Sequence, residues 1–239
     1  MSYRTYFKSL KLYILLTPCF LFPLFAFGEQ EIISKHDYSI YKGKILFGKS
    51  SYSLHLKDDI YFFEIKSQTD GLFKIKKDDR LEQSSYRIND RVVLPIKYEY
   101  IRDSRSKQEH IITNFDGESH AYTLNKGIKK DHSNEDNYLD RLSVQIAFQE
   151  DMKKGIFESS YNVIDKGRAR QYIYTVHSND VLDTILGEIN TIVIKRVIAN
   201  NKRSTLTWYA VDHDYIPVKI QQYRKESLKF TVYLEQVIK

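Results

Sequence analysis

Residues 156–177 read IFESSYNVIDKGRARQYIYTVH, and this stretch is the clearest indication that the chain belongs to the β class. Two runs rich in β-branched and aromatic residues flank a tight turn at 165–167. In the second run Tyr172, Tyr174 and Val176 fall on one face of an extended strand, because successive side chains of a strand point to opposite faces. The stretch therefore predicts a β-hairpin.

The same period of two recurs along most of the chain. Residues 51–57 alternate strictly, with Tyr52, Leu54 and Leu56 on one face. Further strands are expected at 60–67, 84–88, 96–101, 110–115, 121–124, 189–199, 204–211, 218–223 and 228–234. These signals amount to roughly ten to twelve strands with the spacing of an antiparallel meander.

One segment departs from this period. Leu139, Leu142, Ile146 and Phe148 fit a helical stripe, acids precede them, and lysines and a glycine follow at 153–155. This pattern predicts a capped amphipathic helix over 138–153. A shorter helical turn is expected at 179–186, where two aspartates open the segment and Gly187 closes it.

Residues 1–28 read as a cleavable signal peptide. Three cations lie in residues 1–11, an apolar run fills 12–27, and Ala26-Phe27-Gly28 supplies small residues for cleavage. Pro18 and Pro23 make the run a poor membrane-spanning helix. Cys19 follows Pro18 where a lipoprotein signal has a small residue, so we interpret it as part of the leader and not as a lipid anchor. The mature protein is expected to be periplasmic and not an integral membrane protein.

Charge and cysteine content exclude several classes of function. The net charge of +6 includes Arg4, Lys8 and Lys11 of the leader, so the rest of the chain carries +3. This mild excess predicts no nucleic-acid partner. The single cysteine is Cys19, which leaves the mature chain without thiol chemistry or disulfides.

Two motifs resemble a known family. Residues 38–48, YSIYKGKILFG, contain Tyr41, Gly43 and Gly48, and residues 208–220, WYAVDHDYIPVKI, contain Trp208, Asp212 and Pro217. Asp140, Leu142 and Gly187 stand between them in the order that this family shows. The chain thus resembles the domain of unknown function 3108 family, over nearly all of residues 36–238. The resemblance implies an exported, β-rich protein, gives these nine residues structural roles, and supplies no catalytic residue.

The acidic and histidine-containing segments favour structural roles. Asp212-His213-Asp214 precedes Ile216-Pro217, and neighbouring residues of an extended chain point to opposite sides, so a polar turn is favoured over a metal site. The acids at 131–140 suit the start of the helix and lack the pattern of a calcium loop. We predict no metal site.

Enzymatic signatures are missing from the sequence. It contains no Gly-x-Ser-x-Gly elbow, no His-Glu-x-x-His and no phosphate-binding glycine loop. A glycosidase-like carboxylate pair is neither supported nor excluded. We therefore predict that the protein is not an enzyme, with no catalytic residues and no cofactor.

These observations combine into one prediction. Residues 29–239 should form a single, mainly β domain, built as one curved antiparallel sheet or a half-open β-barrel with the helix across its concave face or mouth. A transmembrane barrel is disfavoured by short strands, charges on both faces and the helix. The aromatic side chains could line a ligand cavity or simply fill the core; they are Tyr61, Phe63, Tyr98, Tyr100, Tyr172, Tyr174 and Trp208.

Two functions remain open at this point. The first is a non-enzymatic periplasmic module that binds a lipid or lipoprotein-like envelope component in the half-barrel. The second is a structural or interaction protein of the envelope that has a filled core and uses a sheet edge or aromatic patch. An apolar cavity of several hundred Å3 would favour the first.

Overall fold

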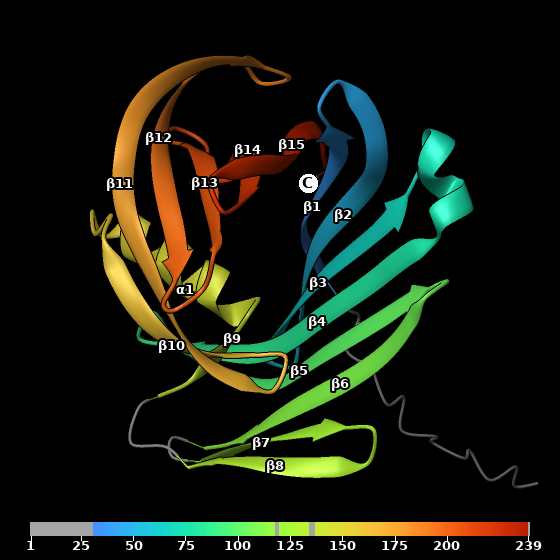
Figure 1. Cartoon of the computed structure of the whole chain (residues 1–239). Helices are drawn as coiled ribbons and strands as arrows, with labels where there is room; N and C mark the ends of the chain where they lie inside the picture. The colour runs from blue at the N-terminus through green and yellow to red at the C-terminus, as the bar shows by residue number, and fades with distance from the viewer. Residues whose placement is uncertain (1–30, 118–119, 134–136, 239) are drawn as a thin grey trace, which may run out of the picture.

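The computed structural model describes residues 31–117, 120–133 and 137–238, so the predicted signal peptide lies outside the described residues. Figure 1 shows a strongly curved sheet rolled around a central space. The strands are β1 (Glu31–Lys42), β2 (Ile45–Lys57), β3 (Ile60–Thr69), β4 (Asp78–Asn89), β5 (Val92–Ser104), β6 (Lys107–Asp116), β7 (His120–Asn125), β8 (Ile128–Ser133), β9 (Leu139–Asp140), β10 (Ser159–Asp165), β11 (Arg168–Thr184), β12 (Gly187–Ile198), β13 (Arg203–Ala210), β14 (Pro217–Arg224) and β15 (Ser227–Ile238). The helices are the 3-10 helix η1 (Gly71–Lys76) and α1 (Ser143–Lys153).

The described strands form a single open sheet. Its order is β8-β7-β6-β5-β4-β3-β2-β1-β15-β14-β13-β12-β11-β10-β9. All neighbours are antiparallel except β9 and β10. Curvature brings the two ends of the sheet close together, since Lys130 Nζ of β8 donates a hydrogen bond to the Gly167 carbonyl at 3.2 Å. The predicted half-open, mainly antiparallel β fold is confirmed.

Because neighbouring strands are antiparallel, the turns alternate between two rims of the rolled sheet. We call one the η1 rim: it carries η1 and the turns at 43–44, 105–106, 126–127, 166–167, 199–202 and 225–226. The opposite rim carries the turns at 58–59, 90–91, 185–186 and 211–216. The two rims present different side chains.

Helix α1 packs on the concave side of the sheet, as predicted, against β4, β5 and β10 (Figure 1). Val144, Phe148 and Met152 are buried along one helical stripe, and the Phe148 ring stacks on Tyr174 at 4.2 Å between centroids. The helix begins at Ser143 and not at 138, because residues 139–140 form β9 instead. One helix in the described residues therefore fills part of the space inside the sheet.

Three sequence-based expectations need correction. The described residues contain fifteen strands, more than the ten to twelve expected, because β1, β8 and β9 lack a strong alternating signal. The helical turn predicted at 179–186 is wrong: Asn179 to Thr184 extend β11 and pair with residues 187–192 of β12. Backbone pairing along this long hairpin overrides the local capping pattern. The segment at 71–76, which we did not assign to a helix, forms η1.

The core divides into two clusters. The larger surrounds α1 and includes Phe63, Tyr86, Tyr98, Tyr172 and Phe148. The smaller includes Tyr38, Val193, Trp208, Val218 and Leu234. Among the described residues, no helix has both the length and the apolar character needed to cross a bilayer.

Candidate functional site

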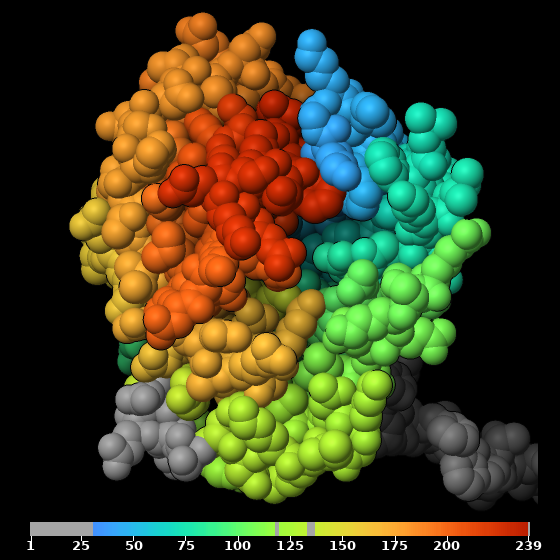
Figure 2. All heavy atoms as spheres, in the orientation of Figure 1, coloured from blue at the N-terminus to red at the C-terminus, as the bar shows by residue number. Residues whose placement is uncertain are grey.

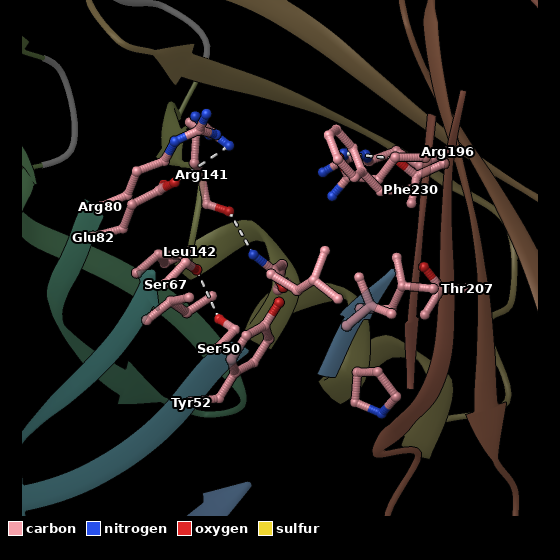
Figure 3. Close-up of a pocket in the computed structure, with 18 of the residues that line it drawn as sticks. Ser50, Tyr52, Ser67, Arg80, Glu82, Arg141, Leu142, Arg196, Thr207 and Phe230 are labelled. Atoms are coloured by element: carbon pink, nitrogen blue, oxygen red, sulfur yellow. Dashed lines mark hydrogen bonds and ion pairs between the residues drawn. The ribbon is translucent and has the colours of Figure 1, made fainter. Parts of the chain in front are cut away.

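A cavity of about 360 Å3 lies inside the rolled sheet (Figure 3). Its walls come from β1–β4, from β11–β15 and from the start of α1. In Figure 2 the surface is hollowed between the red strands near the C-terminus and the teal and green strands opposite them. The volume is within the range that small-molecule sites use.

Strand alternation places polar side chains in this cavity. Ile194 and Arg196 of β12 point inward, as do Thr205, Thr207 and Tyr209 of β13. Positions i and i+2 of a strand share a face, so every second residue of these strands points into the cavity. The interior is thus partly hydrophilic.

The charged residues that line the cavity are mostly cations. The lining contains two acidic residues, Asp78 and Glu82. It contains five basic residues: Arg80, Arg141, Lys166, Arg196 and Arg203. The two carboxylates are already paired. Arg80 and Arg102 donate to Asp78 at 2.6 and 2.7 Å, and Glu82 accepts a hydrogen bond from Tyr98 Oη at 2.8 Å. An excess of positive charge therefore faces the cavity.

Arg141 stands on one wall, next to Glu82. Its guanidinium lies 3.5 Å from a Glu82 carboxylate oxygen and 3.5 Å from one of Asp165. Burial works against its charge, but Glu82 and the neighbouring groups outweigh this effect and hold the pKa of Arg141 well above its ordinary value. Arg141 is thus permanently charged and is held in place from two sides.

Arg196 occupies the opposite wall, across the cavity from Arg141 and Arg80 (Figure 3). Its Nη2 donates to Thr205 Oγ1 at 3.0 Å, and its guanidinium lies 4.9 Å from the centre of the Tyr172 ring. In the described part of the chain no carboxylate lies within 4.0 Å of it, and its buried Nε has no acceptor. A partly buried cation without a counter-ion is costly and favours an anion.

Lys166 is the third cation, at the tip of the β10–β11 hairpin. Its Nζ lies 3.3 Å from the centre of the Tyr100 ring, a cation–π contact. Burial, reinforced by the nearby charge of Arg141, lowers the pKa of Lys166 to about 7. Its charge in the cavity therefore changes near neutral pH.

A second cavity, of about 760 Å3, adjoins the first on the side of the opposite rim. It lies between α1, β1–β4 and the 211–216 turn. Most of its lining side chains are apolar, and seven of them are aromatic: Tyr38, Tyr52, Tyr61, Phe63, Tyr86, Tyr209 and Tyr215. Tyr52, Gln145, Tyr209 and Pro217 line both cavities. One cavity is mainly apolar and the other is cationic, with these four side chains between them.

Unsatisfied hydrogen-bonding groups concentrate at these cavities. Among the described residues, four buried side-chain nitrogen or oxygen atoms have no hydrogen-bond partner. Three of them are Tyr86 Oη, Tyr174 Oη and Arg196 Nε, and all three residues line the cavities. Buried polar groups in native proteins are nearly always paired, so these unpaired groups are an energetic cost that the fold carries beside the cavities.

The seven aromatic residues singled out from the sequence divide between wall and core. Tyr61, Phe63 and Tyr174 line the cavities. Tyr98, Tyr100 and Tyr172 are almost fully buried and pack behind the walls. Trp208 lies in the smaller cluster, where its indole N–H donates to Asp180 at 3.0 Å. Both interpretations of the aromatic residues, cavity wall and filled core, thus apply to part of the set.

Asp140 and Leu142 are two motif residues that lie together at the start of α1, where Leu142 lines the cationic cavity, as Pro217 does. Asp140 is fully buried at the start of α1, where its Oδ1 accepts from the backbone amides of Leu142 and Ser143 at 2.7 and 2.9 Å. Its Oδ2 accepts from Ser84 at 2.7 Å. Burial raises the pKa of Asp140 against the effect of these hydrogen bonds. These contacts fix the backbone from which Arg141 reaches the cavity.

The other motif residues are spread over the sheet. Tyr41 packs edge-on to Tyr233 at 5.9 Å, and the Pro217 carbonyl accepts from Tyr38 Oη at 3.1 Å. Gly43 and Gly187 lie in turns with positive φ, of 62° and 90°. Gly48 lies in β2, where a side chain would overlap the backbone of Gln68. None of these contacts suggests chemistry.

Asp212 is exposed in the β13–β14 turn together with His213 and Asp214. The favoured interpretation of this segment as a polar turn is thus correct. Within the described ranges, no three histidine, cysteine, aspartate or glutamate residues are placed to hold a metal ion.

The sequence analysis missed the cations of the cavity. Arg141 stands between the two motif residues Asp140 and Leu142, and Arg196 interrupts the apolar run 192–198 at an inward position. A charge on the inward face of a strand was the available signal. Lys166 offered none, since a lysine at a hairpin tip is ordinarily solvated.

Comparison with known proteins gives a family. The family model described as "Protein of unknown function (DUF3108)" matches residues 37–232. This chain belongs to the DUF3108 family. No curated protein is similar in sequence to this DUF3108 protein.

Solved structures share the fold at low sequence identity. A β-barrel-like protein of domain of unknown function DUF1849 from Brucella abortus is similar with a TM-score of 0.56 and 6% identity, over 85% of this chain and 96% of that one. A Bacteroides fragilis protein with a YmcC-like fold, described as a candidate exported protein, is 10% identical with a TM-score of 0.37, over 89% and 99% of the two chains. The first likeness shows that the DUF3108 protein has a β-barrel-like fold.

Proposed function

We propose that this DUF3108 protein is a non-enzymatic, exported module that binds an amphipathic envelope molecule, lipid or lipoprotein-like, inside its half-barrel. The supporting observation is the pair of adjoining cavities, one mainly apolar and one cationic. An amphipathic molecule with an anionic group complements both at once. Its apolar part would lie against Tyr61 and Phe63, and its anionic group would lie between Arg141 and Arg196.

The geometry of the cationic cavity supports binding over catalysis. Among its described lining residues there is no histidine, and the Ser50 hydroxyl is hydrogen-bonded to Ser67 at 2.7 Å and to the Lys66 carbonyl at 3.0 Å. Its two carboxylates are held by arginines or a tyrosine. A nucleophile beside a free base, which hydrolysis would need, is not found among these residues.

The predicted signal peptide supports a periplasmic location. Residues 1–28 have the order of a positively charged, an apolar and a small-residue segment. A protein exported in this way would meet lipids and lipoproteins of the envelope. The ligand class and the location therefore support each other.

Native mass spectrometry tests the proposal. The full-length gene is expressed, and the exported protein is purified without detergent and analysed before and after solvent extraction. We expect a lipid or lipid-linked molecule at near-stoichiometric amount, and much less of it on Arg196→Leu. The control is Lys195→Leu, which alters the exposed neighbour on the same strand. A clean apo mass for the unaltered protein, under conditions that preserve the fold, would contradict the proposal.

One observation favours the alternative of an envelope interaction protein. Strand β8 is the last strand of the sheet on its side, so one of its edges has no strand partner among the described residues. An open edge can accept a strand from another protein. Crosslinking from Lys129 in cells would identify such a partner. If no protein is crosslinked to this position, the result would count against this function.

A further inference from the structure

The η1 rim carries a strong excess of positive charge. Taking each of its turns with the flanking strand residues, it has fourteen lysines and arginines and four acids. The four turns named for the opposite rim have two cations and five acids by the same count. The cations of the η1 rim are Lys42, Lys44, Lys74, Lys76, Lys77, Arg105, Lys107, Lys126, Lys166, Arg168, Lys202, Arg203, Arg224 and Lys225. The molecule is therefore electrically polarised along its axis.

Only part of this charge is neutralised. Lys74 pairs with Asp70 at 2.9 Å, and Lys77 pairs with Asp103. In the described part of the chain, the ion pairs within 4.0 Å do not include Lys42, Lys44, Lys76, Lys202 or Lys225. These five lysines are free to meet an external anion.

Exposed aliphatic side chains lie among these lysines. Leu72, Ile75 and Ile128 are 80%, 69% and 72% exposed, and Ile45 and Leu228 are also exposed. Each is within two residues of a lysine in the sequence. Isolated apolar residues on a surface are common, but five of them on one basic rim form a pattern typical of interfacial membrane binding.

The turn η1 is anchored so that its aliphatic residues project. Phe73 packs on Phe47 at 4.9 Å, and Phe47 packs in turn on Phe230 at 4.8 Å. Asp70 caps the turn by accepting from the Gly71 amide at 2.8 Å. With Phe73 held inward, Leu72 and Ile75 on either side of it are left in solvent.

We propose that the η1 rim docks onto the surface of an anionic phospholipid bilayer. Its lysines and arginines contact lipid phosphates, and Leu72 and Ile75 enter the interface. Nucleic acid is a poorer match, because strand-binding proteins add aromatic stacking to their cations, and aliphatic side chains have no such partner. The anionic lipids would repel the acidic residues of the opposite rim, so the protein should dock with the η1 rim toward the bilayer.

This orientation places the cationic cavity near the bilayer. Thr69, Asp78, Lys166 and Arg203 line that cavity and lie at the η1 ends of their strands. The docking surface can be tested independently of the proposed ligand site, because substitutions on this surface can be made at residues that do not line the cavity: Lys42, Lys44, Leu72 and Ile75.

Vesicle co-sedimentation tests the proposal with the protein purified from the full-length gene. Binding to vesicles that contain roughly one third phosphatidylglycerol should exceed binding to phosphatidylcholine vesicles at least about tenfold and should weaken in high salt. The charge-reversed variant Lys42→Glu/Lys44→Glu/Lys76→Glu should lose about tenfold or more of this binding. Leu72→Ser/Ile75→Ser should lose several-fold. Val92→Ser, on a residue of the opposite rim that is 56% exposed, should lose none.

Several results would overturn the proposal: equal binding to both vesicle types, undiminished binding of the charge-reversed variant, or tighter binding to duplex DNA than to anionic vesicles at the same salt. Arg196→Leu separates this proposal from the preceding one. If that variant sediments normally with vesicles yet carries no ligand, both proposals stand. A protein that binds vesicles but never carries a ligand would contradict only the ligand site.

Discussion

Lys166 Nζ lies 3.3 Å from the centre of the Tyr100 ring, although the two residues are 66 positions apart and on different sides of the half-open barrel. Tyr100 is almost fully buried, so the lysine at the tip of an ordinary β-hairpin is drawn inward and is only partly exposed. The burial lowers the pKa of Lys166 to about 7, from its ordinary value of 10.5. This burial makes the charge of the cavity sensitive to pH, whereas the contact with the Tyr100 ring by itself favours the charged ammonium.

Stability should rise with pH above neutrality because of Lys166. Between pH 7 and 10.5 the unfolded chain keeps this proton and the folded chain has lost it, so the free energy of unfolding increases across that window. Below about pH 7 both states are protonated, and the contribution of Lys166 is constant. Urea unfolding at a series of pH values gives the free energy of unfolding as a function of pH. This free energy should rise less steeply with pH for Lys166→Met than for the control Lys126→Met, which alters another turn of the same rim. Equal slopes would contradict the assignment.

The affinity for an anionic amphiphile should fall as pH rises. Protonated Lys166 adds a positive charge to the cavity at pH 6, and most of that charge is gone at pH 8.5. We expect the dissociation constant to be several-fold larger at pH 8.5 than at pH 6, measured by calorimetry with a single-chain amphiphile whose charge is constant over this range, such as an alkyl sulfonate below its micellar concentration. In Lys166→Met the pH dependence should largely disappear. An unaltered pH profile in that variant would show that another group titrates.

Arg196→Leu should reduce ligand affinity without unfolding the protein. Hydrogen bonds to a charged group contribute about 1.5–3 kcal/mol, so the loss should be roughly tenfold to a hundredfold. The free energy of unfolding should change by less than about 1 kcal/mol, because the variant also removes a buried Nε that lacks an acceptor. Lys195→Leu, on the exposed face of β12, should change neither quantity. A loss of stability in Arg196→Leu that equals the loss of affinity would indicate a structural role.

Gly48→Ala should destabilise the fold more than Gly43→Ala. A Cβ atom on Gly48 would overlap the Gln68 carbonyl of the paired strand β3, and backbone cannot move aside as a side chain can. We expect a cost of about 3 kcal/mol, the upper end for overpacking. Gly43 has open space around it and a φ of 62°, so alanine there should cost about 1 kcal/mol. Thermal unfolding of both variants checks the order, and the reverse order would exclude the close approach of β2 and β3.

The sequence was informative where a feature is local. Alternation predicted the hairpin at 156–177 and the strands around it, because a period of two needs only neighbouring residues. The segment 179–186 was misassigned because its aspartates suggest a helix, while its structure comes from pairing with residues 187–192. The cavity could not be predicted either. Arg141 and Arg196 face each other only through the curvature of a fifteen-strand sheet, which no local pattern encodes.

Asp140→Ala should be among the most destabilising single substitutions in the chain. The carboxylate of Asp140 accepts from Ser84 Oγ and from the amides of Leu142 and Ser143, all buried, and truncation leaves three donors without a partner. At roughly 1 kcal/mol for each donor, the free energy of unfolding should fall by about 3 kcal/mol. Urea unfolding measures this loss, and a midpoint within error of the unaltered protein would refute it.

Two further variants determine whether the hydrogen bonds of Asp140 or its charge matter. Asp140→Asn keeps an oxygen for the two amides, and because burial raises the pKa of this carboxyl, a neutral side chain suits the site. We expect Asp140→Asn to lose less than half of what Asp140→Ala loses. The exposed motif residue Asp212, changed to alanine, should lose less than about 0.5 kcal/mol. Since Asp140 fixes the backbone beside Arg141, Asp140→Ala should also weaken ligand binding, whereas Asp212→Ala should not.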